Sequence, residues 1–281
     1  MGISIVSNVS SLNGQRQLSK TQRSLDSSLQ RLTSGFRINS AMDDAAGLGV
    51  SEQMRAQIRG LSQAARNAND GLSVVQTAES AMGEISGVLI RMRELTVQSA
   101  SDSISDTERD YLDTEFQELI LEINRIAATT KFNGNVLLNG DFAAGTADLD
   151  FQVGIESGAN FKITVNIDNV SVTGLGFVGG EDVKTKTTSL AAMNKLDSAL
   201  KTLSTARSNI GAKGNRLQVA GSAAEIMREN LSAANSRIRD TDVAHETSVL
   251  SRTQVLMQAG TAMLAQANQQ PQMALALIGG G

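Results

Sequence analysis

The sequence predicts a mainly α-helical fold: a long coiled-coil helical rod built from both chain ends, with a small β-hairpin insert between them. Three observations lead to this prediction. Apolar residues recur every seven positions over two long stretches, and both chain ends have broad apolar faces. Strict alternation of apolar and polar residues occurs only in a short middle segment. We expect residues 1–44 and 242–281 to form a terminal-helix domain, and residues 45–241 a rod domain with its β-hairpin region at about 132–185.

The first predicted helix lies near the N-terminus and has a single apolar stripe. Val9, Leu12, Leu25, Leu29 and Leu32 form this stripe, while serine, glutamine and arginine occupy the other faces. An isolated amphipathic helix is only marginally stable in water. This helix therefore needs to pack against another part of the protein or against another subunit.

A second helix is expected over residues 45–99, about 80 Å long at about 1.5 Å per residue. Asp43 and Asp44 precede it, and because no further ligands flank them we interpret them as loop or helix-start residues rather than as a metal or acid–base site. Two apolar positions per heptad indicate a coiled-coil seam. The seams contain Met54, Leu61, Ala68, Val75, Met82 and Leu89, and Ile58, Ala65, Leu72, Ala78, Ile85 and Met92.

Two further helices are predicted from the spacing of their apolar residues. Ser105 and Glu108 form a capping-box pattern ahead of an apolar series with steps of four and three residues. In the later helix, Gly214 and Gly221 would each cost about 1 kcal/mol relative to alanine, so we interpret them as sites of close approach by a neighbouring helix. The apolar series are Leu112, Phe116, Leu119, Ile123 and Ile126, and then Leu196, Leu203, Ile210, Leu217, Ala224, Leu231 and Ile238.

The segment between these helices has strand and turn signals. Asn133-Gly134 predicts a tight turn. Apolar residues alternate over 151–155 and again over 161–167, which predicts a β-hairpin. Residues 168–186 are rich in glycine and threonine and weakly patterned, so we expect a surface loop there.

The last helix has two adjacent apolar stripes, which make a face wider than one partner helix needs. From Thr253 to Gly281 there is no Asp, Glu, Lys or Arg, and glutamine and asparagine interrupt the apolar residues. Such a segment suits burial against other protein better than a lipid span, so the chain looks like a subunit of an assembly. The predicted interface residues are Val249, Leu250, Leu256, Met257, Met263 and Leu264.

Composition argues against most enzyme chemistry. The chain has no cysteine, which excludes thiolate catalysis and thiol-ligated metals. His245 is the single histidine, and without an evident nucleophile or orienting partner we interpret it as a surface or interface imidazole. The net charge of −4 argues against a nucleic-acid binder. We expect no catalytic residue, cofactor or metal, and from the sequence we expect neither a cleaved signal peptide nor a transmembrane span.

Several motifs resemble the terminal signatures of bacterial flagellins. They are RLTSGFRINS at 31–40, DDAAGL at 43–48, QIRGL at 57–61, ARNANDG at 65–71, FNG at 132–134, SRIRD at 236–240 and QAGTAMLAQAN at 258–268. Val243 stands where the family usually has an aromatic residue. The segment between Asp141 and Thr188 is too short for large outer domains, so the chain resembles a minimal flagellin.

The resemblance implies a structural subunit that self-assembles into the extracellular flagellar filament used for swimming, with its terminal helices in the inner tube. The implied partners are other copies of the chain, the flagellar cap and hook-junction proteins, an export chaperone and the flagellar type III apparatus, which exports flagellin without signal cleavage. It also implies that a host toll-like receptor of innate immunity contacts Arg91, Leu95 and Glu115. The alternatives are a hook–filament junction protein of the same family and, in a different class, a secreted membrane-active translocator.

Overall fold

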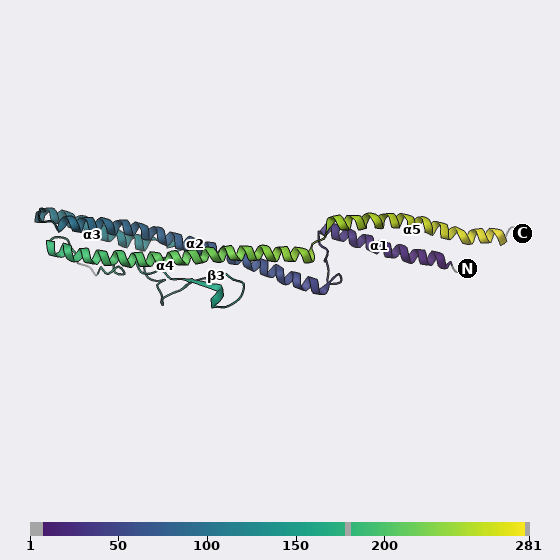
Figure 1. The fold of residues 1–281 in the computed structure, drawn as a ribbon, viewed down its shortest axis with the longest axis horizontal. Helices are drawn as coiled ribbons and strands as arrows, with labels where there is room; N and C mark the ends of the chain where they lie inside the picture. Colours follow the sequence, from purple (N-terminus) through teal and green to yellow (C-terminus); the bar gives the residue numbers. More distant parts are fainter. Residues whose placement is uncertain (1–7, 178–180, 279–281) are drawn as a thin grey trace. The chain divides into compact units, whose positions relative to one another are not determined.

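The computed structural model describes residues 8–177 and 181–278 of the chain, with the side chains of residues 270–278 left out. The long elements of the described ranges are α-helices, so the predicted mainly helical fold is confirmed (Figure 1). The helix expected over residues 45–99 begins and ends at these residues in the structure. The helices are α1 (Val9–Ser34), α2 (Ala45–Ser99), α3 (Asp106–Thr129), α4 (Lys186–Arg239) and α5 (Val243–Ile278).

The chain divides into two compact units. Residues 1–56 and 230–281 form one, the terminal unit, and residues 57–229 form the other, the central unit. The division lies inside α2 and α4, whereas the sequence-based boundaries lie in the loops at residues 44–45 and 241–242. The first turns of α2 contact the last turn of α4, as in the 2.6 Å ion pair between Glu52 and Arg239, and these turns therefore belong to the terminal unit.

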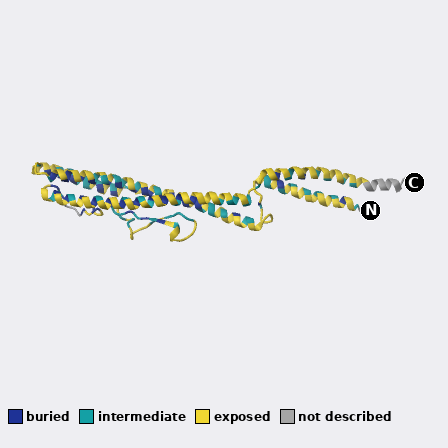
Figure 2. Cartoon of the chain, in the orientation of Figure 1, coloured by how far each residue is buried: buried dark blue, intermediate teal, exposed yellow. Residues whose placement is uncertain are grey.

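Heptad positions form the core of the central unit. In α4, Leu196, Leu203, Ile210 and Leu217 are each no more than 1% exposed, and Figure 2 shows such buried positions along the inner faces of the helices. The predicted seam positions of α2 between Ala78 and Met92 are buried in the same cluster. Burying a large aliphatic side chain contributes about 1.5–3 kcal/mol. Burial of the seams therefore contributes strongly to the stability of this unit.

Glycines allow close approach of helices, as the sequence predicted. A Cβ on Gly214 would lie 3.1 Å from Val75 Cγ1, and a Cβ on Gly221 would lie 3.4 Å from the Ala68 Cβ. Both glycines of α4 thus face residues of α2. A side chain at Gly214 would require Val75 to shift, because the contact is already tight.

The capping box at the start of α3 is present in the structure. The Ser105 backbone N–H donates to Glu108 Oε2 at 2.8 Å, and the Glu108 N–H donates to Ser105 Oγ at 3.4 Å. The bond from the Ser105 backbone, with that from its hydroxyl, lowers the pKa of Glu108. The cap satisfies backbone donors that the first turn of a helix otherwise leaves unpaired.

Two small hairpins follow α3. β1 (Lys131–Phe132) pairs antiparallel with β2 (Asn135–Val136) across Asn133 and Gly134, which have φ of +48° and +86°. β3 (Leu149–Gln152) pairs antiparallel with β4 (Lys162–Val165), with Phe151 opposite Ile163, and a short 3₁₀ turn η1 (Ala159–Phe161) precedes β4. Both hairpins occur where the turn and alternation signals predicted them.

The expectation of a surface loop over residues 168–186 is wrong in both halves of the segment, since Val183 near its end is 0% exposed. Val170, Val172 and Phe177 are 0%, 7% and 1% exposed and belong to the main core. The Val172 N–H donates to the Asn124 side chain of α3 at 3.2 Å, which fixes the segment to that helix. The segment covers the helices with irregular backbone, so its apolar residues have no period that sequence reasoning could detect.

Replacing Phe177 with alanine tests whether this segment is part of the core. The side chain is almost fully buried, so we expect Phe177→Ala to lower the free energy of unfolding by about 3–5 kcal/mol. The matched control is Thr173→Ala at an exposed position of the same segment, expected to change it by less than about 0.5 kcal/mol. Denaturant unfolding of the full chain, followed by circular dichroism, measures both. Equal stabilities of the two variants would restore the surface-loop interpretation.

Candidate assembly interface

Helices from opposite ends of the sequence pair in the terminal unit. α1 and α5 lie side by side, and each has a defined start. The Asn8 side chain accepts the Ser11 N–H at 3.0 Å at the start of α1, and Asp242 Oδ1 accepts the N–H groups of Ala244 and His245 at 2.9 and 3.1 Å at the start of α5. These caps determine where the paired helices begin.

Two glycine–leucine contacts define the register of this pair. A Cβ on Gly14 of α1 would lie 3.2 Å from Leu264 Cγ, and a Cβ on Gly260 of α5 would lie 3.1 Å from Leu18 Cδ1. Asn8 Nδ2 also donates to the Ala267 carbonyl oxygen at 2.8 Å. Of the residues in these contacts, only Leu264 was placed in the interface from the sequence, and Gly14 and Gly260 were missed, although glycine inside an amphipathic helix was the available signal. A shift of one helix along the other would lose both contacts.

The loop after α1 is joined to the end of α4. Phe36 forms an isolated antiparallel bridge with Asp240, and the Arg239 guanidinium lies 4.7 Å from the Phe36 ring centroid. The Arg37 N–H donates to the Arg239 carbonyl oxygen at 2.6 Å. Arg239 also donates to Glu52 and, as the largest cause, lowers the pKa of that carboxyl. We refer to Phe36, Arg37, Arg239 and Asp240 as the junction.

Acidic residues near the junction have structural partners. Asp44 Oδ1 accepts the Gly47 N–H at 2.8 Å in the first turn of α2, which confirms the helix-start interpretation. Asp43 Oδ2 accepts the N–H of Ser40 at 2.9 Å, and this bond is the main cause of the lowered pKa of Asp43. Glu246 is buried and lies 3.7 Å from Arg31. These carboxylates hold loops and helix starts in place.

The predicted interface residues of α5 divide into two groups. Val249, Leu250, Met257 and Leu264 are half-buried, whereas Leu256 and Met263 remain 53% and 70% exposed. The intramolecular partner α1 thus leaves part of the apolar face uncovered. Val9 and Leu12 of α1 are also exposed, at 59% and 54%. These four exposed apolar side chains, Val9, Leu12, Leu256 and Met263, are together called the uncovered face below.

The structure separates the three residues expected to contact a receptor. Arg91 and Glu115 are joined at 2.8 Å between α2 and α3, and this contact is the main cause of the raised pKa of Arg91. Leu95 is 1% exposed inside the core, so the expectation that it shares a surface with Arg91 is wrong. The cause is the position of α2, which packs against both α3 and α4 and so buries a wider arc than one seam.

The described residues offer neither a membrane span nor a metal cluster. No helix among them is long and apolar enough to cross a membrane. The same residues contain no group of three or more His, Cys, Asp or Glu side chains that could hold a metal ion. His245 is exposed at the start of α5, where its backbone N–H is part of the cap.

Family models match both ends of the chain. The model of the bacterial flagellin N-terminal helical region matches residues 5–143, and the model of the C-terminal helical region matches residues 193–278. A flagellin of Halalkalibacterium halodurans is 44% identical over 271 residues, covering 96% of this chain and 98% of the relative. The flagellar filament 33 kDa core protein of Treponema phagedenis is 41% identical over 280 residues, covering 96% and 98%.

Solved structures show the same fold. The crystal structure of Bacillus cereus flagellin matches with a TM-score of 0.50 and 31% identity, covering 57% of this chain and 88% of that one. A putative flagellar hook-associated protein from Vibrio parahaemolyticus matches with a TM-score of 0.55 and 15% identity, covering 71% and 98%. The second match is a likeness of fold alone.

Proposed function

The chain belongs to the bacterial flagellin family and is a structural subunit of the flagellar filament, and from this premise we propose how its subunits assemble. The paired helices α1 and α5 form the inner tube of the filament, and contacts between copies bury the uncovered face. The observation that supports this arrangement is the exposure of Leu256 and Met263 on a helix that already has its intramolecular partner.

The energetics favour assembly through this face. Each large apolar side chain removed from water contributes about 1.5–3 kcal/mol. The uncovered face has four such side chains in each copy, Val9, Leu12, Leu256 and Met263. A repeated head-to-tail contact that does not close on itself generates a helical polymer. Together these contacts produce a filament rather than a closed oligomer.

Cysteine labelling tests the burial, because the natural chain contains no cysteine. Met263→Cys is exposed in the single chain and is expected to react rapidly with a maleimide as monomer and slowly in filaments. The control Leu203→Cys, at a position 1% exposed in the core of the central unit, is expected to react slowly in both states. Dissociated filaments of Met263→Cys should label fully again. Rapid labelling of this variant within intact filaments would contradict the proposed inner tube.

The partners of the chain and its route of export follow from the same proposal. Subunits are exported through the flagellar type III apparatus with an export chaperone and without signal cleavage, and they add to the filament outside the cell beneath the cap and beyond the hook-junction proteins. The chain performs no catalysis. The relatives described above are flagellins and filament core proteins, which favours a filament subunit over a hook–filament junction protein or a membrane-active translocator.

A host toll-like receptor is proposed to contact Arg91 and Glu115 on the free subunit. Arg91 is half-exposed, and arginine often forms the centre of an interface. We expect the potency of Arg91→Ala monomer in a receptor reporter assay to fall about thirtyfold. This fall corresponds to a loss of about 2 kcal/mol of binding free energy. Arg93→Ala is the control, because Arg93 is similarly exposed but pairs with Asp197 of α4. Unchanged potency of Arg91→Ala would overturn the proposed contact.

A further inference from the structure

Charge is divided unevenly between the two units. The terminal unit has nine basic and seven acidic side chains, a net charge of +2 with histidine neutral. The central unit has sixteen basic and twenty-two acidic side chains, a net charge of −6. Unlike charges on different units of one chain can attract each other when copies of that chain assemble.

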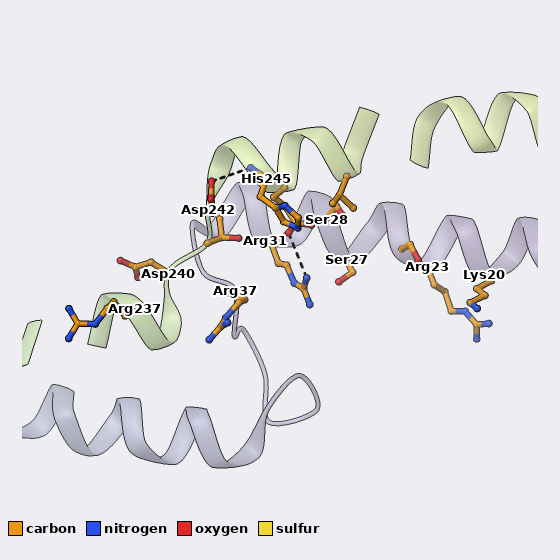
Figure 3. Close-up of a pocket in the computed structure, with 14 residues that line it drawn as sticks. Lys20, Arg23, Ser27, Ser28, Arg31, Arg37, Arg237, Asp240, Asp242 and His245 are labelled. Atoms are coloured by element: carbon orange, nitrogen blue, oxygen red, sulfur yellow. Dashed lines mark hydrogen bonds and ion pairs between the residues drawn. The ribbon is translucent and has the colours of Figure 1, made fainter. Parts of the chain in front are cut away.

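A groove of about 980 Å³ runs along α1 in the terminal unit (Figure 3). Its cationic side chains are Lys20, Arg23 and Arg31 of α1, Arg37 of the junction and Arg237 at the end of α4. A second hollow continues along α1 from Leu12 to Arg23 and shares Arg23 with the groove. We call the first of these, of about 980 Å³, the basic groove, and Leu12 of the second hollow is part of the uncovered face.

The acidic side chains that line the basic groove are Asp240, Asp242 and Glu246, and two of them have internal partners. Glu246 is buried against Arg31, and Asp242 caps α5. By contrast, Lys20, Arg23 and Arg237 are exposed and form no ion pair with any residue that the structure describes. The groove therefore has positive charge that the single chain does not neutralise.

We propose that the basic groove docks an acidic surface of the central unit of a second copy. This inference rests on the proposed filament, because the filament is what brings other copies of the chain against the groove. The central unit has the matching charge. On its helices, the exposed carboxylates that form neither a cap nor an ion pair among the described residues are Asp70, Glu84, Asp110, Glu118, Glu225 and Glu229.

Zero-length cross-linking identifies the occupant of the groove. A carbodiimide adds no spacer, so it joins a lysine amine only to a carboxylate in direct contact. Lys20 is the one lysine in the sequence of the terminal unit, so a lysine link from this unit identifies the groove. In filaments mixed from isotope-labelled and unlabelled copies, we expect Lys20 to be linked to an Asp or Glu of the central unit of another copy. The same link should be absent in monomer. Lys20→Arg, which keeps the charge, should assemble normally and lose the link.

Charge reversal gives a second readout. Arg23→Glu is expected to raise the critical concentration for assembly at least about tenfold, because it places a carboxylate in the groove. Arg252→Glu makes the same charge change at an exposed position of α5 outside the groove, and it should have much less effect. Higher salt should weaken wild-type assembly more than assembly of Arg23→Glu.

Several outcomes would overturn the proposal. Normal filaments in which Lys20 is linked only to carboxylates of the terminal unit, or to none, would defeat it and leave the filament function intact. Equal effects of Arg23→Glu and Arg252→Glu would do the same. Binding of monomer to phosphatidylglycerol vesicles that depends on Lys20 and Arg23, without links in filaments, would assign the groove to a lipid surface. Failure of the wild-type chain to polymerise would overturn both proposals.

Discussion

Deleting residues 254–281 is expected to abolish filaments and to leave a soluble, helical chain. The deletion removes Leu256 and Met263 from the uncovered face, and it removes Leu264, which packs on Gly14. The central unit keeps its own core, because none of that core lies in α5. Sedimentation and electron microscopy measure assembly, and circular dichroism measures the remaining helix. Normal filaments from the truncated chain would contradict the proposed role of α5.

A double substitution separates loss of the uncovered face from loss of the helix. Leu256→Gln with Met263→Gln keeps α5 and its contacts with α1, since both positions are exposed in the single chain. Losing two apolar contacts of about 1.5–3 kcal/mol each should raise the critical concentration more than about a hundredfold. Assembly of this variant at the wild-type concentration would show that α5 acts only through its intramolecular pairing.

Free monomer is expected to exchange amide hydrogens much faster in α1 and α5 than in the central unit. In α1 only Ser11 and Ser28 are buried, so no large apolar side chain anchors the helix. In the central unit, the seams of α2 and α4 are almost fully buried. Because exchange through local opening depends exponentially on the opening free energy, protection should differ by several orders of magnitude.

Hydrogen exchange with mass spectrometry checks this pattern in monomer and in filament. Residues 54–95 and 196–238 should be protected in both states, whereas residues 9–34 and 243–278 should become protected only on assembly. Limited proteolysis of monomer should first cut within the same end segments. Equal protection of all four segments in monomer would mean that the α1·α5 pair is stable without neighbouring copies.

The fold could be predicted where local pattern determines burial. The heptad steps of α2 and α4 placed positions such as Leu89 and Ile210 in the core, because a seam repeats the same environment every two turns. Phe177 could not be placed in this way. Its burial depends on an irregular segment that packs onto helices far away in sequence, and no periodicity marks it.

The candidate interface could be predicted only in part for the same reason. The two apolar stripes of α5 indicated that one partner helix is insufficient, whereas the contacts of Gly14 and Gly260 depend on which helix pairs with which. Leu95 was assigned to a receptor-binding surface by resemblance to the family's contact positions, together with Arg91 four residues before it. A helix packed on two sides buries positions that a single-seam pattern leaves exposed, and Leu95 is one of them.

Helical reconstruction of filaments grown from the purified chain at neutral pH, by electron cryomicroscopy, tests the central claim most directly. We expect a hollow helical polymer with α1 and α5 at the smallest radius, the central unit outside them, and Leu256 and Met263 buried between copies. Discrete monodisperse particles under all salt and precipitant conditions would contradict it. So would a polymer in which the central unit lines the channel and the terminal helices lie on the outer surface.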